Sequence, residues 1–559
     1  MSCRRATRHA TRKPRATASA PPAGGISRDE RLRLARRIDW RFLLPSPHLG
    51  RVALVGPPDD ELRAALAMAT GTEPVDLSGA GDGAHEAFDT VVLRGRMDLN
   101  ALALAAAAVA PHGRLIAEIG GPLPGPLLRR EASGPGAAVR VGRALTAGGF
   151  ASVSTWLTWP SHARAVAWAR MDDRAAIRAL VQRRLGAGAG GGTRAVAALA
   201  GRVAGTSAGA AFAPALTVVA ERDAGGGSLV GRRLRDGDDG PEPSLLVLTP
   251  RYRASAHVVG LAIDAASGAP LTVAKVARLP DDTSLQAEAA VLGALGRAHG
   301  DPDRRPTLID APGLATDVGV EPWPILVETG LRGSALDPAA VRRDRAAALD
   351  GIVGWLAGLP VDEPALRELA ASERIAAALR HVERVSGSAD TDPELARLVA
   401  RTRPIVAALE GAALPRTFEH GDPAHPNLVR LDDGRIGAVD WERGQPDGLP
   451  LHDLTIALAY VAAAARGATT AADQADAFRA AMTEPDPWAR QALDRDSTRL
   501  GIDPGLRPAL VVAAWARSAG WLAEHLAEGG LVDDGMAAWL VADRSVTLWR
   551  VALDLAEAG

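Results

Sequence analysis

The sequence has very little cysteine, lysine and asparagine. Its only cysteine is Cys3, which excludes a disulfide within the chain and a zinc site built on cysteines. Among 64 lysine and arginine residues only Lys13 and Lys275 are lysine, and the only asparagines are Asn100 and Asn427. The chain is instead rich in arginine, alanine and glycine, as are proteins of GC-rich genomes. A lysine or asparagine inside an ordered region is therefore a candidate for a chemical role.

Long apolar runs are also absent. No run reaches the ~18 residues of a membrane-spanning helix without a charge, a glycine or a proline inside it, so no membrane partner is expected. The formal net charge of -2 argues against nucleic acid as a partner of the whole molecule. With 47% apolar and 23% charged residues, the chain is expected to be a globular cytoplasmic protein. Its 559 residues predict roughly three to four domains, or two large ones.

Composition divides the chain into five segments. Residues 1–35 are basic and are expected to form a disordered tail, with an arm for nucleic acid or an acidic surface as the alternative. Residues 36–185 alternate strand and helix patterns, and residues 186–212 resemble a flexible linker of glycine and alanine. Strand patterns dominate residues 213–332, and residues 333–559 are almost entirely helical. A strand-rich lobe followed by a helical lobe predicts a ligand cleft between them.

The alternation over residues 36–185 predicts an α/β domain with a mostly parallel sheet and helices on both faces. Its last two strands, 152–158 and 163–169, are close enough in sequence to form an antiparallel pair, which we expect at one edge of the sheet.

The order of these elements resembles that of class I S-adenosylmethionine-dependent methyltransferases, a Rossmann-like fold, over residues 40–185. Those enzymes have a glycine-rich turn after the first strand, where the backbone approaches the cofactor. Here residues 56–60 read Gly-Pro-Pro-Asp-Asp, and proline removes backbone donors. Asp76 ends the second strand, where such folds often place a ribose-binding acid. The resemblance together with this departure at residues 56–60 implies a degenerate methyltransferase domain. The alternative is a working methyltransferase that binds S-adenosylmethionine.

The stretch 418–442 carries the strongest chemical signal. Asp433 and Gly434 are typical of a two-residue turn, so they predict a hairpin centred between them. In that register Asn427 and Asp440 lie directly opposite each other, with Cβ atoms roughly 4.5 to 5.5 Å apart. An amide oxygen and a carboxylate at this separation suit a hard cation such as Mg²⁺.

A third polar side chain, Asp422, precedes Asn427 by five residues in an irregular loop with two prolines. It is expected to project beside the metal ligands rather than toward the metal. A free carboxylate next to a metal pair suits phosphoryl transfer, because it accepts or orients the proton of an attacking hydroxyl group.

Two motifs in this stretch resemble those of the aminoglycoside phosphotransferase/choline kinase family. They are His-Gly-Asp at 420–422 with Asn427, and Val-Asp-Trp-Glu at 439–442. The family has the protein-kinase-like fold, so the resemblance implies a bilobal α+β domain with a β-rich N-lobe at 213–332 and a helical C-lobe at 333–559.

The same resemblance implies roles for individual residues. Asp422 corresponds to the catalytic base, Asn427 and Asp440 to the Mg²⁺ ligands, and His420 and Asp453 to structural support of the catalytic loop. Glu442, which follows in the second motif, has two interpretations: a contact to substrate or an ion pair with a nearby arginine.

The N-lobe is then expected to bind the nucleotide. Lys275 lies in a predicted strand and Glu288 follows on a predicted helix; in kinases such a lysine contacts the α/β-phosphates and is held by the glutamate. Ser255 lies in a small-residue loop whose backbone could approach phosphate. By position, the backbone of Glu328 and Gly330 corresponds to the hinge that binds the adenine edge.

Together these residues predict an enzyme: a phosphotransferase that uses ATP and Mg²⁺ to phosphorylate a hydroxyl group of a small molecule of the aminoglycoside or choline type. Two alternatives remain open, a bifunctional protein with an active methyltransferase domain and a non-catalytic pseudokinase scaffold. The sequence leaves the acceptor and the oligomeric state open.

Overall fold

A computed structural model describes residues 26–78, 87–95, 99–120, 135–185, 215–224, 227–235, 242–250, 255–298, 302–310, 323–362, 368–386, 393–528 and 534–558. The expected linker at 186–212 and most of the expected tail at 1–35 lie outside these residues.

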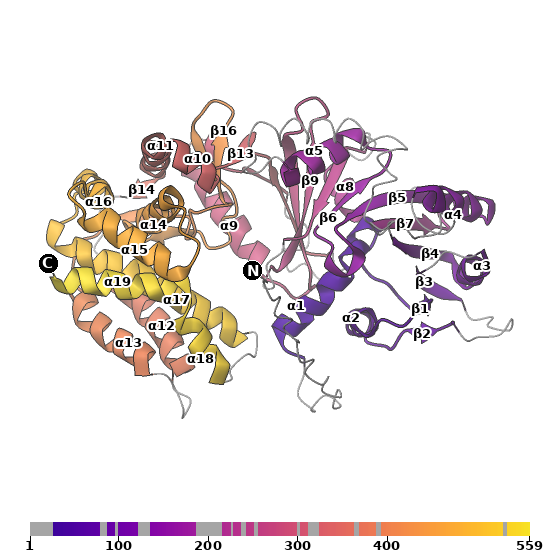
Figure 1. Cartoon of the computed structure of the whole chain (residues 1–559), viewed down its shortest axis with the longest axis horizontal. Coiled ribbons are helices and arrows are strands. Elements are labelled where there is room, and N and C mark those ends of the chain that lie inside the picture. Colours follow the sequence, from indigo (N-terminus) through magenta and orange to yellow (C-terminus); the bar gives the residue numbers. More distant parts are fainter. Residues whose placement is uncertain are drawn as a thin grey trace, which may run out of the picture.

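One twelve-stranded sheet runs through the N-terminal half of the molecule (Figure 1). Its order is β11-β12-β10-β9-β8-β6-β5-β7-β4-β3-β1-β2. The strands are β1 (Val52–Val55), β2 (Val75–Asp76), β3 (Phe88–Arg94), β4 (Val109–Gly120), β5 (Ser152–Trp159), β6 (Ala167–Arg170), β7 (Ala215–Glu221), β8 (Ser244–Leu248), β9 (His257–Ile263), β10 (Pro270–Ala277), β11 (Leu308–Asp310) and β12 (Ile325–Thr329).

The first part of the sheet is parallel, as the sequence predicts. β1 pairs in parallel with β2 and β3, and β3 with β4, with α2 (Asp60–Thr70) and α3 (Leu99–Ala107) as crossovers. β7 inserts antiparallel between β4 and β5. The expected division at residue 213 therefore does not hold for β7, which pairs with strands of the N-terminal segment. The resemblance of this segment to methyltransferases stays a prediction.

The expected sheet edge at β5 and β6 is wrong. β5 and β6 do form the predicted antiparallel pair, but β8 pairs with the other side of β6 through Ala167–Leu248, Trp168–Val247 and Ala169–Leu246. An open edge would expose unpaired N–H and C=O groups, and β8 satisfies them. The strands of the N-terminal segment and those of the predicted N-lobe consequently form one continuous sheet.

A single apolar core covers one face of this sheet across both halves. Trp40 and Phe42, both almost fully buried, belong to the same cluster as Val258, Ala274 and Ile325 of β9, β10 and β12. Burial of apolar area is the main favourable contribution to folding. The N-terminal segment thus supplies a layer that the nucleotide lobe would otherwise lack on that face.

Part of the expected disordered tail is a helix, which corrects the boundary at residue 35. α1 (Arg28–Arg37) begins at Ser27, whose side chain accepts a hydrogen bond from the Glu30 N–H, and it buries Leu32 and Leu34. Arginine-rich composition suggested a solvated tail, but arginines of α1 pair with acids elsewhere in the chain: Arg28 with Asp282, Arg31 with Asp281 and the buried Arg37 with Glu118.

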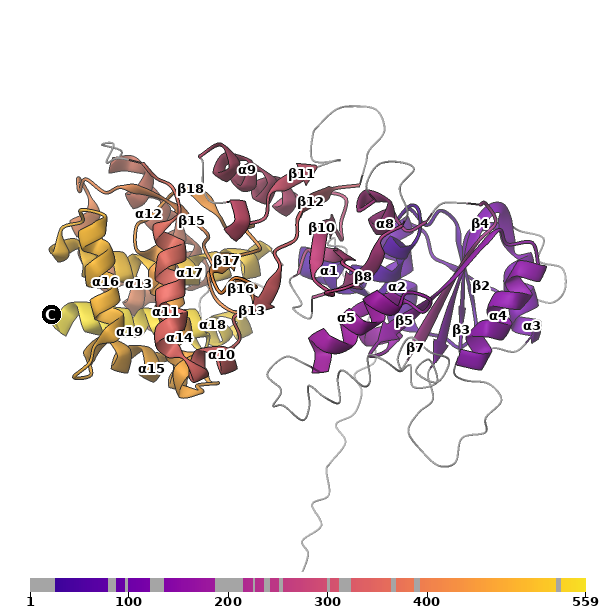
Figure 2. The same cartoon turned by 90° about the horizontal axis from the view of Figure 1, so that it is seen from above.

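Ion pairs connect α1, which is seen next to β10 in Figure 2, and the 3₁₀ turn η1 (Asp39–Leu43) to the end of β10. Asp39 and Arg278 form a buried pair at 3.0 Å, and Arg31 pairs with Asp281 at 2.9 Å on the surface. The chain after β10 leads directly into α9 (Ser284–Arg297), which carries Glu288. The N-terminal segment therefore holds the start of a helix that the candidate site needs.

The predicted strand and helix that carry Lys275 and Glu288 are confirmed as β10 and α9. The remaining chain forms the predicted helical lobe, on the left of Figure 1. Its helices are α10 (Pro338–Arg343), α11 (Arg345–Ala357), α12 (Glu368–Ser386), α13 (Pro393–Val406), α14 (His452–Arg466), α15 (Ala471–Thr483), α16 (Trp488–Arg499), α17 (Arg507–Glu528), α18 (Asp534–Val541) and α19 (Arg544–Ala558).

At two places in this lobe an aspartate separates consecutive helices. The side chain of Asp344 accepts the Ala347 N–H and starts α11, and the side chain of Asp543 accepts the Ser545 N–H before α19. Two short sheets lie beside the helices: β13 (Gly333–Ala335), β16 (Leu428–Leu431) and β17 (Ile436–Ala438), and β14 (Val361–Asp362), β15 (Arg416–Glu419) and β18 (Gln445–Gly448).

Within the described chain, no helix on its own has the length and apolar character to cross a membrane. α14 and α15 reach that threshold only as a pair, across a bend of 106°.

The buried pair of Asp39 and Arg278 gives a test of this architecture. Asp39→Ala leaves the Arg278 guanidinium buried without its carboxylate, and the free energy of unfolding should fall by about 3–5 kcal/mol. Calorimetry of the full-length chain would detect this as a lowered Tm. The control is Arg31→Ala, which removes a partly exposed pair worth less than about 1 kcal/mol. Equal effects of the two substitutions would contradict the proposed role of the Asp39–Arg278 pair in holding the N-terminal segment to the end of β10.

Candidate active site

The hairpin of the candidate site forms, but its register differs by one residue from the prediction. Leu428 pairs with Ala438 and Arg430 with Ile436, and the Leu431 N–H donates to the Arg435 carbonyl at 2.9 Å. The loop is three residues long and ends at Gly434, which has φ +87°. A turn followed by a left-handed residue is the usual three-residue hairpin, and glycine accommodates it.

This register places Val439, not Asp440, opposite Asn427. The Val439 N–H donates to the Asn427 carbonyl at 2.9 Å. The predicted direct pairing of Asn427 with Asp440 is therefore wrong. Asp440 follows with φ +71°, a left-handed conformation that is rare for residues other than glycine and concentrates at functional sites. That conformation, rather than strand pairing, directs its carboxylate to within 3.3 Å of Lys275 Nζ.

The loop between β15 and β16 presents Asp422 as a half-buried side chain. His420 holds this loop: its Nε2 contacts the Val439 carbonyl at 2.9 Å, and its Nδ1 accepts the Asp422 N–H at 3.3 Å. The Asn427 side-chain amide donates to the Asp422 carbonyl at 3.1 Å. Gly421 has φ +86°, and a Cβ there would lie 2.7 Å from the Arg443 carbonyl. His420 thus couples the Asp422 loop to the strand end that carries Asp440.

Asp453, at the start of α14, anchors the same loop from behind. Its two carboxylate oxygens accept the N–H groups of His420 at 2.6 Å and Gly421 at 2.9 Å. Burial raises the pKa of Asp453 to about 8, and the nearby Glu419 carboxylate acts in the same direction.

Sequence reasoning missed a buried ion pair next to this anchor. Arg517 of α17 binds both oxygens of Glu419 at 2.8 Å, and the Leu449 N–H donates to Glu419 at 3.0 Å. Burial alone would raise the pKa of Glu419, but His452 and Arg517 lower it to about 2. We attribute the lowering to Arg517, because burial depresses the pKa of His452 to about 4 and leaves that ring neutral at pH 7. The only sequence signal for this ion pair was a glutamate, Glu419, within a short buried strand.

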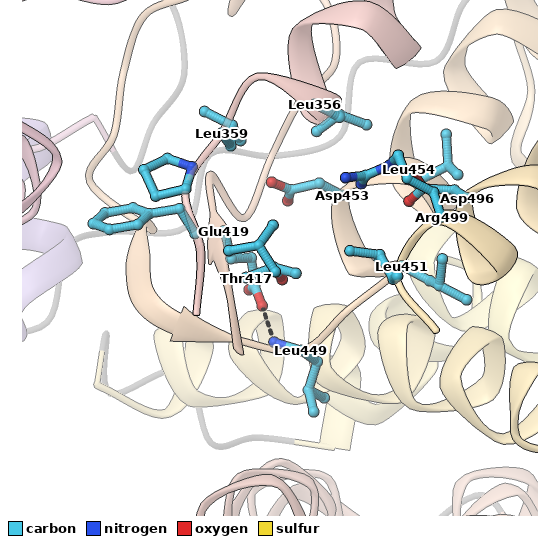
Figure 3. A pocket seen from close by; sticks show the side chains of 14 residues that line it. Leu356, Leu359, Thr417, Glu419, Leu449, Leu451, Asp453, Leu454, Asp496 and Arg499 are labelled. Atoms are coloured by element: carbon cyan, nitrogen blue, oxygen red, sulfur yellow. Dashed lines mark hydrogen bonds and ion pairs between the residues drawn. The ribbon is translucent and has the colours of Figure 1, made fainter. Parts of the chain in front are cut away.

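A cavity of about 30 Å³ lies beside Glu419 and Asp453 (Figure 3). Thr417, Glu419, Leu449, Leu451 and Asp453 are among the residues that line it. That volume suits about one water molecule and no substrate. The cavity lies behind the loop that presents Asp422 and is too small to be a substrate site.

The centre of the site is Lys275, whose ammonium group lies among three carboxylates. Its Nζ is 2.5 Å from Glu288 Oε1, 3.3 Å from Asp440 Oδ1 and 3.7 Å from Glu328 Oε1. All but Asp440 are almost fully buried. Burial lowers the pKa of Lys275, but the carboxylates outweigh burial and raise it well above its ordinary value. The structure therefore brings Lys275, Glu288 and Asp440 together.

Glu288 also joins α9 to the segment that follows the hairpin. Its Oε1 accepts the Trp441 backbone N–H at 2.9 Å in addition to the Lys275 ammonium. Trp441 is fully buried and packs on the His420 ring with centroids 4.7 Å apart. A shift of α9 would therefore move both Lys275 and the segment that presents Asp440.

Negative charge exceeds positive charge in this cluster. Burial raises the pKa of Glu328 to about 8, although Lys275 opposes the shift. Burial and the Asp440 carboxylate raise the pKa of Glu442 to about 7. Glu288 Oε2 and Glu328 Oε2 are buried and have no hydrogen-bond partner among the described residues. These are the conditions that a bound divalent cation relieves.

The structure gives the expected hinge residues contacts within the sheet. The Gly330 N–H donates to the Leu271 carbonyl at 2.8 Å, and Glu328 lies in β12 between Val273 of β10 and Leu308 of β11. An adenine contact of these two residues stays a prediction. Glu328 also contributes its side chain to the Lys275 cluster.

Ser255 has contacts of its own. Its carbonyl accepts the Arg278 guanidinium and its hydroxyl donates to the His257 carbonyl at 3.2 Å. The preceding residues 251–254 lie outside the described chain, so a phosphate-binding role for this loop stays a prediction.

The interpretation of Glu442 as a partner of nearby arginines also changes. Its Oε2 lies 3.6 Å from Nε2 of His257, the first residue of β9. Arg443 instead lies 3.8 Å from Asp422 and places its guanidinium over the Trp521 ring. The imidazole of His257 was not singled out from the sequence, since nothing in the pattern of β9 distinguishes it from a buried strand residue.

Residues 265–493, which include Lys275, Asp422 and Asp440, match the model of the phosphotransferase enzyme family. The match covers less than half of the chain. The resemblance inferred from the motifs at 420–422 and 439–442 is confirmed, and the match supports small-molecule phosphotransfer as the class of activity. No curated protein matches the chain.

Solved structures with similarity to the chain include three kinases. An ethanolamine kinase of Plasmodium vivax is 10% identical, with a TM-score of 0.35 over 55% of this chain and 83% of that chain. A choline kinase of Streptococcus pneumoniae is 14% identical, with a TM-score of 0.36 over 56% and 93%. A choline/ethanolamine kinase family protein of Mesorhizobium loti is 17% identical, with a TM-score of 0.34 over 58% and 95%. Similarity at this level carries no argument about activity.

The Glu419–Arg517 pair predicts a specific dependence of stability on pH. The pKa of Glu419 is about 2 in the folded chain and near 4.5 when unpaired. The unfolded chain therefore binds more protons in this window, so the pair stabilises the fold above about pH 4.5 and the effect is lost as pH falls toward 2.

Glu419→Gln should lower the stability at pH 7 by about 3 kcal/mol and by progressively less in acid. Calorimetric Tm values of the two proteins between about pH 6 and 3 would show the difference shrinking. Glu484→Gln, which removes an exposed pair with Arg466, is the control and should show no such trend. A constant difference between wild type and Glu419→Gln would contradict the assignment.

Proposed function

We propose that the protein is a kinase that transfers the γ-phosphoryl group of ATP to a hydroxyl group of a small molecule of the aminoglycoside or choline type. The observation that carries the proposal is the convergence of Lys275, Glu288 and Asp440 from three separate elements, next to the loop that presents Asp422. The match of residues 265–493 to the phosphotransferase family model supports it.

In this proposal Lys275 binds the α/β-phosphates. Its ammonium is fully charged at neutral pH, and Glu288 fixes its position. A lysine held by a helix glutamate is the recurrent phosphate contact of kinases. Phosphate oxygens would take the place that the Asp440 carboxylate occupies at 3.3 Å.

The donor set fits Mg²⁺, which in kinases neutralises the charge of the transferred phosphoryl group. Asp440 and the side-chain oxygen of Asn427 would hold the ion, as hard oxygen ligands suit it. The excess of buried carboxylates around Lys275 supports a divalent cation as the missing partner.

Asp422 would accept the acceptor's hydroxyl proton. Its side chain is half-buried, and its backbone is fixed by His420 and Asn427, so it is held in place yet reachable. Arg443 and Trp521 lie on the same side and would border the acceptor.

Substitution of the proposed base tests the assignment. Asp422→Asn should lower turnover by about 10²- to 10⁴-fold, the usual contribution of a general base. ATP affinity should stay near the wild-type value, because the base acts on the acceptor. Release of ADP during a screen of hydroxylated metabolites measures turnover, and calorimetry measures ATP binding. Asp432→Asn, in the loop between β16 and β17, is the control and should behave as wild type. Full turnover in Asp422→Asn would exclude the assigned role.

We further propose that the N-terminal segment is a structural extension of the nucleotide lobe and not an active methyltransferase. Ligands of parallel α/β sheets bind outside the carboxyl ends of the strands. At those ends an ion network fills the space: Arg37 and Arg94 both pair with Glu118, at 2.7 and 3.0 Å, and both pair with Asp59, at 3.1 and 2.8 Å. Burial would raise the pKa of Glu118, but Arg37 lowers it to about 2. The Glu118 carboxylate is therefore paired with Arg37 within the protein.

The turn after β1 is closed as well. The Ser78 hydroxyl contacts both the N–H and the carbonyl of Gly56, at 2.9 and 3.0 Å. Asp76, the expected ribose acid, accepts the Ser78 N–H at 2.9 Å and pairs with Arg63 at 3.3 Å. The groups that would face a cofactor are thus bound within the chain.

Titration of S-adenosylmethionine into the full-length chain should give no heat of binding. The same sample should bind ATP in the presence of Mg²⁺, which controls for its quality. A saturable signal with one cofactor per chain would support the bifunctional alternative and contradict this proposal.

A further inference from the structure

A second set of metal-ligand atoms overlaps the candidate active site. His257, Asp440 and Glu442 each offer one ligand atom, and these three atoms all lie within 4.8 Å of one another. The histidine comes from the first position of β9, whereas the two acids follow β17. Two lobes of the protein therefore contribute to one cluster.

The state of His257 is unusual. Its side chain is only 7% exposed, yet neither ring nitrogen forms a hydrogen bond within the described residues. Nε2 is 3.6 Å from Glu442 Oε2, which is too long for a hydrogen bond, and Nδ1 is buried without a partner. Buried polar groups are almost always satisfied. The His257 imidazole is buried and faces the Asp440 and Glu442 carboxylates, but it forms no hydrogen bond with either of them. An ion between the three groups would satisfy the imidazole.

We propose that His257, Asp440 and Glu442 bind one divalent transition-metal ion, of which Mn²⁺ is the representative. Imidazole is a common ligand of divalent transition metals, whereas Mg²⁺ takes oxygen ligands, and the two carboxylates suit Mn²⁺ as well as Mg²⁺. The three ligand atoms lie within 4.8 Å of one another and have room to close around one ion. The site goes beyond the proposed function, which takes only oxygen donors from Asn427 and Asp440, and it does not require turnover.

Nitrogen coordination can be observed directly. Mn²⁺ is titrated into the full-length, tag-free protein without nucleotide, and the bound ion is examined by electron paramagnetic resonance with spin-echo detection of ¹⁴N coupling. Wild type should show ¹⁴N coupling from one imidazole. His257→Gln should lose it and should bind Mn²⁺ at least about tenfold more weakly. The affinity for Mg²⁺ should change by less than about threefold, because Mg²⁺ takes oxygen ligands.

His162→Gln is the matched control, because that ring lies in the N-terminal segment and already contacts the Leu216 carbonyl at 3.1 Å. It should leave the spectrum and the affinity unchanged. Absence of ¹⁴N coupling in the wild-type protein would overturn the proposal whatever the variants do. Unchanged Mn²⁺ affinity in a folded His257→Gln variant would overturn it as well. Since no nucleotide is present, neither result depends on whether the protein is a kinase.

Discussion

The candidate site depends on one buried ammonium group among carboxylates. Lys275 lies 2.5 Å from Glu288 and within 3.7 Å of Asp440 and Glu328, in surroundings where unpaired charge is costly. Each partner comes from a different element, so the charge balance positions β10, α9, β12 and the end of the hairpin relative to one another. The Trp441 N–H on Glu288 extends this arrangement to the segment that holds Asp440, and His420 extends it to the Asp422 loop. Phosphate and metal binding would therefore act on a site that is already assembled.

The large sheet accounts for how this assembly is supported. β8 joins the nucleotide lobe to β6, and Trp40 and Phe42 lie in the same apolar cluster as residues of β9, β10 and β12. The buried Asp39–Arg278 pair fixes the segment that leads into α9. Within the N-terminal segment, Arg37 and Arg94 both pair with Glu118 of β4, which connects α1, β3 and β4. The two halves of the chain are physically one unit, although their sequence patterns suggest separate domains.

Much of the site could be predicted from the sequence because it depends on local patterns. The elements of Lys275 and Glu288 follow from strand and helix periodicity, and the rarity of lysine drew attention to Lys275. The hairpin register could not be settled in this way, since Asp-Asp-Gly suits both a two-residue and a three-residue loop, and one residue of slip exchanges Val439 for Asp440. Long-range pairing was equally out of reach. The insertion of β7 between β4 and β5, the Glu419–Arg517 pair and the approach of His257 to Glu442 all join residues that no local pattern connects.

The central claim is that the Lys275 cluster is a nucleotide-phosphate site. Calorimetric titration of ATP with Mg²⁺ into wild type, Lys275→Met and Lys13→Met tests it most directly, because the control alters the only other lysine of the chain. The account predicts saturable binding by wild type and by Lys13→Met. It also predicts at least about tenfold weaker binding by Lys275→Met, as expected for the loss of a charge-assisted hydrogen bond. Equal ATP affinity of a folded Lys275→Met variant and wild type would contradict it.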